Sequence, residues 1–178
     1  MLGGLEKEVS SLKYAIVLDF GYPNDPEEIS SITDLAQCAQ RNYWKDDDAV
    51  VLAQSCTYEH LMKGDLLPKG KLLRINVGQS NTNGLEEGGS YHVLKRASEM
   101  IAERGDSYAE TEVEIVAHKL HLPRVMKQAE LFNLKVRPSK NLPTNLYPTA
   151  AQWWCRKKYL WYFREIVGYI PLKLSGQL

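Results

Sequence analysis

Five short apolar segments constrain the fold of this chain more than any other feature. They are YAIVLDF (14–20), AVVLAQ (49–54), KLLRINV (71–77), VEIVAH (113–118) and LKVRP (134–138), and stretches with helical periodicity separate them. Runs this short and this apolar are typical of parallel strands that helices cover on both faces. The pattern therefore predicts an α/β protein with a doubly wound, Rossmann-like and mainly parallel sheet of about five strands.

Helical patterns fill the gaps between these segments. Asp25, Pro26 and Glu28 give a start signal for the first helix, because they offer a cap, a proline at the first helical position and a capping-box acid. Further amphipathic helices are expected over 93–101 and 123–132, where apolar residues recur at helical spacing. No repeat or linker divides the chain, so a single domain is expected over residues 1–178.

The tail from about Thr149 carries aromatic residues around most of its circumference, in AAQWWCRKKYLWYFREIVGYI. We expect a C-terminal aromatic helix that is buried on more than one side. Its large apolar side chains are too many for one exposed face, so part should pack on the sheet. The remainder is expected to form a patch suited to a symmetric homodimer.

The composition excludes several classes of partner. Lysine plus arginine and aspartate plus glutamate both number 22, so no long-range field favours nucleic acid or an anionic membrane. Three scattered cysteines argue against a disulfide framework and a structural zinc site. The N-terminus lacks the pattern of a signal peptide, and no run approaches the ~18 apolar residues of a membrane span. We expect a cytoplasmic protein without nucleic-acid, membrane or metal partners.

The stretch VAHKLHLPR (116–124) carries the densest chemistry and follows the fourth apolar segment. In doubly wound sheets, ligands bind beyond the carboxyl ends of the strands. A helix that starts near Pro123 would favour an anion at its N-terminus, and Arg124 could bind the same phosphate or carboxylate. His121 could hold or transfer a proton near neutral pH, and His118 is a candidate ligand-binding residue. The alternative stays open that His121 bonds the backbone and that Arg124 forms a surface ion pair.

The ends of the other strands supply further polar candidates. The loop GQSNTNGLEEGG (78–89) can wrap a polar ligand through backbone amides, although a simple helix-capping turn is the alternative. Neither a GxGxxG fingerprint nor a GxSxG nucleophile pattern is present, and Cys56 is interpreted as a packed small apolar side chain. The candidate ligand-binding residues in these places are Gly21, Ser55, Glu59, Asn81 and Thr82.

Several motifs resemble those of the YdcF-like family, which includes envelope proteins of the SanA and ElyC type. VAHKLHLPRVMKQAELFNLKVRP is similar to the family's strand, HxPR helix start and following strand. Ser80-Asn81-Thr82, with the acids and the helix ending in ERG that follow, looks like its S-x-N-T-x-E-N-A segment, and the tail looks like its terminal aromatic helix. The likeness covers roughly residues 14–170. It implies a doubly wound fold with pocket residues Asn81, Thr82, His121, Pro123 and Arg124.

The resemblance also implies acids and ligands for the site. Glu59 corresponds to the acid after the second strand, and Glu86 is the nearest candidate for the acid after Asn81-Thr82. One branch of the family implies S-adenosylmethionine. The first hypothesis is an enzyme for a phosphorylated or nucleotide-like metabolite, with His121 as acid or base and Glu86 or Glu59 as its partner. The second is a non-catalytic binding module for S-adenosylmethionine or a related nucleoside.

Overall fold

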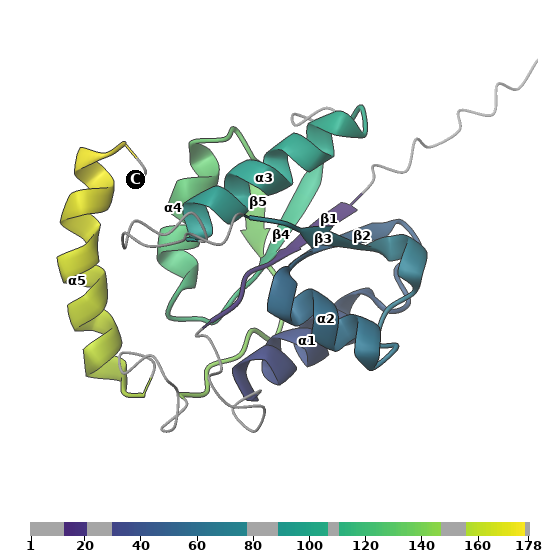
Figure 1. Ribbon diagram of the computed structural model, residues 1–178, viewed down its shortest axis with the longest axis horizontal. Coiled ribbons are helices and arrows are strands. Elements are labelled where there is room, and N and C mark those ends of the chain that lie inside the picture. Colours follow the sequence, from purple (N-terminus) through teal and green to yellow (C-terminus); the bar gives the residue numbers. More distant parts are fainter. Residues whose placement is uncertain (1–12, 21–29, 78–88, 107–110, 147–155, 177–178) are drawn as a thin grey trace, which may run out of the picture.

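The computed structural model describes residues 13–20, 30–77, 89–106, 111–146 and 156–176. Within them, strands and helices alternate along the chain as the apolar pattern predicts (Figure 1). The elements are β1 (Lys13–Val17), α1 (Ser30–Tyr43), β2 (Ala49–Gln54), α2 (Ser55–Lys63), a 3-10 turn (Lys69–Lys71), β3 (Leu72–Ile75), α3 (Ser90–Glu103), β4 (Glu112–Val116), α4 (Leu122–Glu130), β5 (Val136–Pro138) and α5 (Lys158–Leu174).

The five strands form one parallel sheet in the order β3-β2-β1-β4-β5. The chain first moves outward from β1 to β3 and then returns to the other side of β1 with β4. The strand order therefore reverses between β1 and β4, where Val17 is paired with Val116. The doubly wound α/β fold is confirmed, and its switch point lies at the carboxyl ends of these two strands.

Helices cover both faces of the sheet, which explains why the strands are apolar on both sides. Ala15 and Val17 of β1 pack in one core cluster with residues of α1 and α2. Tyr14 and Ile16 pack in a second cluster with residues of α3 and α4. Figure 1 shows these two helix pairs on opposite sides of the strands.

The amphipathic patterns place the helices correctly. Val93 and Leu94 of α3 and Leu35 of α1 are fully buried, as their spacing predicts. Gly105 has a φ of +82° just beyond the end of α3, a backbone conformation that glycine adopts without steric cost. The helix-start signal at Asp25, Pro26 and Glu28 lies outside the described residues.

The expectation that the terminal helix is buried on more than one side is wrong. Among the α5 side chains that the structure describes, only Trp161 enters the core, at 3% exposure, whereas Phe163 is 58% and Ile166 is 69% exposed. In Figure 1, α5 stands at one flank of the molecule, next to α4 and away from the other helices. Within the described residues, the domain therefore covers only one side of α5. No helix among the described residues is long and apolar enough to cross a membrane.

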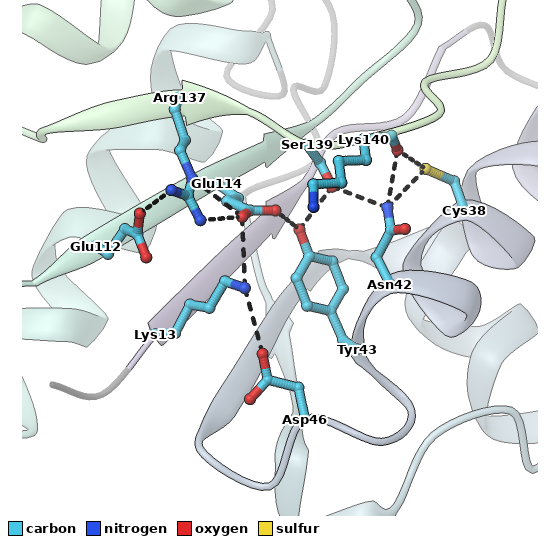
Figure 2. Close-up of polar contacts among 10 residues, drawn as sticks. All are labelled: Lys13, Cys38, Asn42, Tyr43, Asp46, Glu112, Glu114, Arg137, Ser139 and Lys140. Carbon is cyan, nitrogen blue, oxygen red and sulfur yellow. Dashed lines mark hydrogen bonds and ion pairs between the residues drawn. The ribbon is translucent and has the colours of Figure 1, made fainter. Parts of the chain in front are cut away.

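A buried carboxylate in the middle of β4 joins four elements (Figure 2). Glu114 accepts two hydrogen bonds from Arg137, with Nε at 3.1 Å and Nη2 at 2.7 Å, and a further one from the Tyr43 hydroxyl. The Lys13 ammonium lies 3.4 Å away. These contacts connect β1, α1, β4 and the β5 strand, and they compensate the burial of the charge.

Replacing Glu114 by glutamine is expected to lower the free energy of unfolding by about 2–3 kcal/mol at neutral pH. Burial alone would raise the pKa of Glu114, but hydrogen bonds from Tyr43 and Arg137 and the charge of Lys13 hold it below its ordinary value. The stabilisation is therefore present above the unfolded-state pKa and is lost as the pH falls through the lower pKa of the folded protein.

Denaturant titrations across acidic and neutral pH measure this difference. The control is Glu59→Gln, which breaks an exposed ion pair with Arg74 and should cost less than about 1 kcal/mol. If Glu114→Gln has the same stability as the parent protein at neutral pH, the network does not stabilise the fold.

Candidate functional site

Aromatic side chains form a buried cluster beyond the carboxyl ends of β1 and β4. The two strand ends adjoin, because the Leu18 N–H donates to the Val116 carbonyl at 2.9 Å. Phe20, which follows β1, stacks on His118, which follows β4, with ring centroids 3.9 Å apart. Trp161 of α5 lies 4.7 Å from the Phe20 ring and donates from Nε1 to the Leu120 carbonyl.

His118 is held by hydrogen bonds to both of its ring nitrogens. Nδ1 accepts from the Leu120 N–H at 3.2 Å, so the ring proton is on Nε2, which lies 2.8 Å from the Asn145 carbonyl. Burial lowers the pKa of His118, although its backbone partners partly oppose this shift. His118 is thus a neutral ring that anchors the loop before α4 and packs against Phe20 in the buried aromatic cluster.

His121 is buried directly before α4 and is also neutral. Its Nε2 lies 3.1 Å from Nη2 of Arg124, and because a guanidinium only donates, the imidazole nitrogen accepts. Burial lowers the pKa of His121 well below its ordinary value, and the charges of Arg124 and Arg164 lower it further. At neutral pH this imidazole has no proton to donate from Nε2, and its hydrogen bond orients Arg124.

The N-terminus of α4 already uses most of its backbone donors. The N–H groups of His121 and Leu122 both donate to the His118 carbonyl, at 2.8 and 3.1 Å. Pro123 follows and has no N–H. An anion at this end of α4 would therefore be bound mainly by side chains.

Two arginines from different helices meet beside this terminus. Nη1 of Arg124 lies 3.5 Å from Oε1 of Glu165, and Nη1 of Arg164 lies 2.9 Å from the same oxygen. The Arg164 guanidinium also lies over the Trp161 ring, 5.3 Å from its centroid. Because α4 and α5 each contribute one arginine, this arrangement exists only in the folded chain.

Asp19, directly after β1, is a site residue that the sequence reasoning missed. Its Oδ1 accepts hydrogen bonds from the backbone N–H and the hydroxyl of Thr57, so this carboxylate caps the N-terminus of α2. Its Oδ2 is buried without a hydrogen-bond partner among the described residues. Burial raises the pKa of Asp19, and the neighbouring groups of Thr57 and Cys56 offset this only in part. The sequence feature that could have indicated this role is the position of an acidic residue at the end of the first apolar segment.

The predicted residues after β2 gather around an arginine of β3. Nε of Arg74 lies 3.4 Å from the Ser55 hydroxyl, and its Nη2 lies 3.2 Å from a Glu59 carboxylate oxygen. Both Arg74 and Glu59 are exposed, so this is a surface ion pair. Burial raises the pKa of Cys56 to about 11, so the thiol stays protonated at neutral pH, as expected for a packed side chain. Gly21, Asn81, Thr82 and Glu86 lie outside the described residues.

The structure defines a doubly wound α/β protein with a cluster of polar and aromatic side chains, the candidate site, at the switch point of its sheet. Comparisons of the chain with protein-family models, curated proteins and solved structures find no match. In the part of the chain that the structure describes, no three histidine, cysteine or acidic side chains form a group that could hold a metal ion.

Proposed function

We propose that this chain binds a phosphorylated or nucleotide-like metabolite beyond the carboxyl ends of β1 and β4. The observation that carries the proposal is the meeting of Arg124 and Arg164 beside the buried Phe20–Trp161 pair at the switch point. Guanidinium groups match the geometry of phosphate oxygens. Open parallel sheets use this position for ligands.

The geometry of His121 favours a protein that binds this metabolite without turnover. The imidazole is neutral and accepts from Arg124, so it supports ligand binding by positioning the guanidinium. S-adenosylmethionine or a related nucleoside is the proposed ligand class in this form. Membership of the YdcF-like family, as a divergent member, is part of the same proposal and rests on the HLPR and Asn81-Thr82 motifs.

Catalysis is the second candidate, and Asp19 is the observation that favours it. A carboxyl with a raised pKa at a ligand site can donate and accept protons nearer to neutral pH than an ordinary aspartate. In this form the chain is an enzyme for the same metabolite class. Asp19 then joins His121 and Glu86, the acid–base residues proposed from the sequence.

Replacing Arg124 by alanine is expected to weaken binding of the metabolite by about 10- to 100-fold, because a charge-assisted pair of hydrogen bonds is lost. Isothermal titration calorimetry with a panel of sugar phosphates, nucleotides and S-adenosylmethionine measures the affinity. Arg124→Lys keeps the charge without the planar fork and should give an intermediate loss.

The matched control for this experiment is Arg96→Ala on α3, which removes an exposed arginine that pairs with Glu99 and Glu103. It should leave the affinity unchanged. Equal affinities of the Arg124→Ala variant and the parent protein, with both folded by circular dichroism, would exclude Arg124 from the site.

The proposed partner is therefore a small molecule in the cytoplasm. Nucleic acid is not part of the proposal, because the chain has no net charge. The homodimer expected from the aromatic tail stays a prediction, which light scattering of the parent protein and of the α5 variant tests.

A further inference from the structure

A helix that packs on a core usually turns its apolar side chains inward and its charged side chains outward. In helix α5, many large apolar side chains face outward, and two charged side chains face the domain. Among the described side chains of α5, Trp161, Arg164 and Glu165 face the domain, and Glu165 contacts both Arg124 and Arg164. Large apolar side chains of the same helix face outward and are between 50% and 83% exposed: Tyr159, Tyr162, Phe163, Ile166, Val167, Ile170 and Leu174.

These exposed residues form one continuous stripe. Their spacings of three and four residues keep them on one face of a helix, along a length of about 25 Å for 17 residues. Large contiguous apolar patches on a protein surface mark a site of interaction. The stripe runs the length of α5, so the occupant must offer an extended apolar surface.

The exposed charges around the stripe are positive. Lys157 and Lys158 lie at its amino end, over the rings of Tyr159 and Tyr162, at 5.9 and 5.7 Å from the centroids. Lys173 lies at its carboxyl end and is exposed. The acid of this helix, Glu165, is instead turned toward Arg124 and Arg164. The outer surface of α5 is therefore both apolar and basic.

We propose that α5 docks this protein on an anionic lipid surface. The helix would lie in the plane of the interface, with its stripe between the lipid chains and its lysines at the headgroup phosphates. The zero net charge of the chain gives no long-range attraction to an anionic membrane. Charges are screened beyond about 8 Å at physiological salt, so the local charge of α5 determines its attraction to the lipid surface.

The same charges disfavour a second copy of α5 as the occupant. In an antiparallel pair, Lys157 and Lys158 of one helix would face Lys173 of the other, and in a parallel pair like ends would meet. Either arrangement brings basic side chains together, with Glu165 of each copy turned away toward its own domain. An anionic surface places a compensating charge at both ends of the helix.

Flotation of the full chain with lipid vesicles tests the proposal. We expect the protein to float with vesicles of phosphatidylcholine mixed with phosphatidylserine, and to float far less with phosphatidylcholine alone. Replacing Lys157 and Lys158 together by glutamine should weaken binding about tenfold or more, since each basic side chain contributes about fivefold at an anionic surface. High salt should weaken it as well.

A variant with Ile166→Glu and Ile170→Glu should abolish flotation, because it places two carboxylates in the stripe. Both positions are exposed, so circular dichroism should show an unchanged fold. The matched controls are Trp44→Glu, an exposed aromatic outside α5, and Lys63→Gln with Lys69→Gln, two exposed lysines near β3. Both controls should float like the parent protein.

Three results would overturn the proposal. The first is no flotation of the parent protein with anionic vesicles. The second is equal flotation with neutral and anionic vesicles. The third is a dimer in light scattering that the Ile166→Glu, Ile170→Glu variant dissociates without any lipid binding, which would assign the stripe to a second copy.

Discussion

Replacing Trp161 by alanine should lower the free energy of unfolding by about 3–5 kcal/mol, the cost of deleting a large buried aromatic side chain. Trp161 is 3% exposed and contacts the rings of Phe20 and His121. Its Nε1 also donates to the Leu120 carbonyl at 3.0 Å, so the variant leaves that acceptor without this donor. Denaturant unfolding followed by circular dichroism measures the loss.

The control for this prediction is Trp44→Ala, since Trp44 is 44% exposed after α1 and should cost less than about 1 kcal/mol. Deleting the chain from Thr149 onward should destabilise the protein at least as much as the single substitution. A truncated protein with unchanged stability would show that α5 is a detachable appendage and that Trp161 does not complete the core.

Replacing Asp19 by asparagine should separate catalysis from stability. If Asp19 is the acid or base of an enzyme, turnover should fall by about 10²- to 10⁴-fold. Asparagine keeps an oxygen for the hydrogen bonds from Thr57, and it replaces the buried carboxylate by a neutral amide, so the charge that burial disfavours is absent. Stability at neutral pH should therefore rise, by about 1 kcal/mol or more.

The raised pKa of Asp19 also determines the direction in which stability changes with pH. Because the pKa of Asp19 is raised in the folded protein, the unfolded chain releases this proton at a lower pH than the folded chain. The parent protein thus loses stability as the pH rises from the unfolded-state pKa of about 3.9 through the folded one, and the variant does not.

Denaturant titrations at several pH values, together with product analysis by mass spectrometry for each ligand that binds, measure both effects. A less stable variant at neutral pH would mean that Asp19 acts as an ionised cap of α2. Product formation that is the same in variant and parent would exclude Asp19 from catalysis, and binding without product in either protein would favour the binding module.

The local sequence pattern determined the fold class and the positions of the elements. Runs such as AVVLAQ have no polar face, so they form strands only where helices cover both sides, and the observed β2 spans the same six residues, Ala49–Gln54. The rule that ligands bind beyond the strand ends directed attention to His118, His121 and Arg124, because these residues follow an apolar segment in the sequence. These inferences need only neighbouring residues and a general property of parallel sheets.

The tertiary structure decided what the polar residues do. Sequence spacing could not show that Arg124 would meet Arg164 and Glu165 from α5, because 40 residues separate the first two in the chain. The protonation of His121 likewise depends on burial and on Arg124, and the carboxyl of Asp19 on its approach to α2. Helix α5 is the clearest case. Its sequence favours a buried helix, but burial requires a partner surface, and among its described side chains the domain covers only the side that carries Trp161.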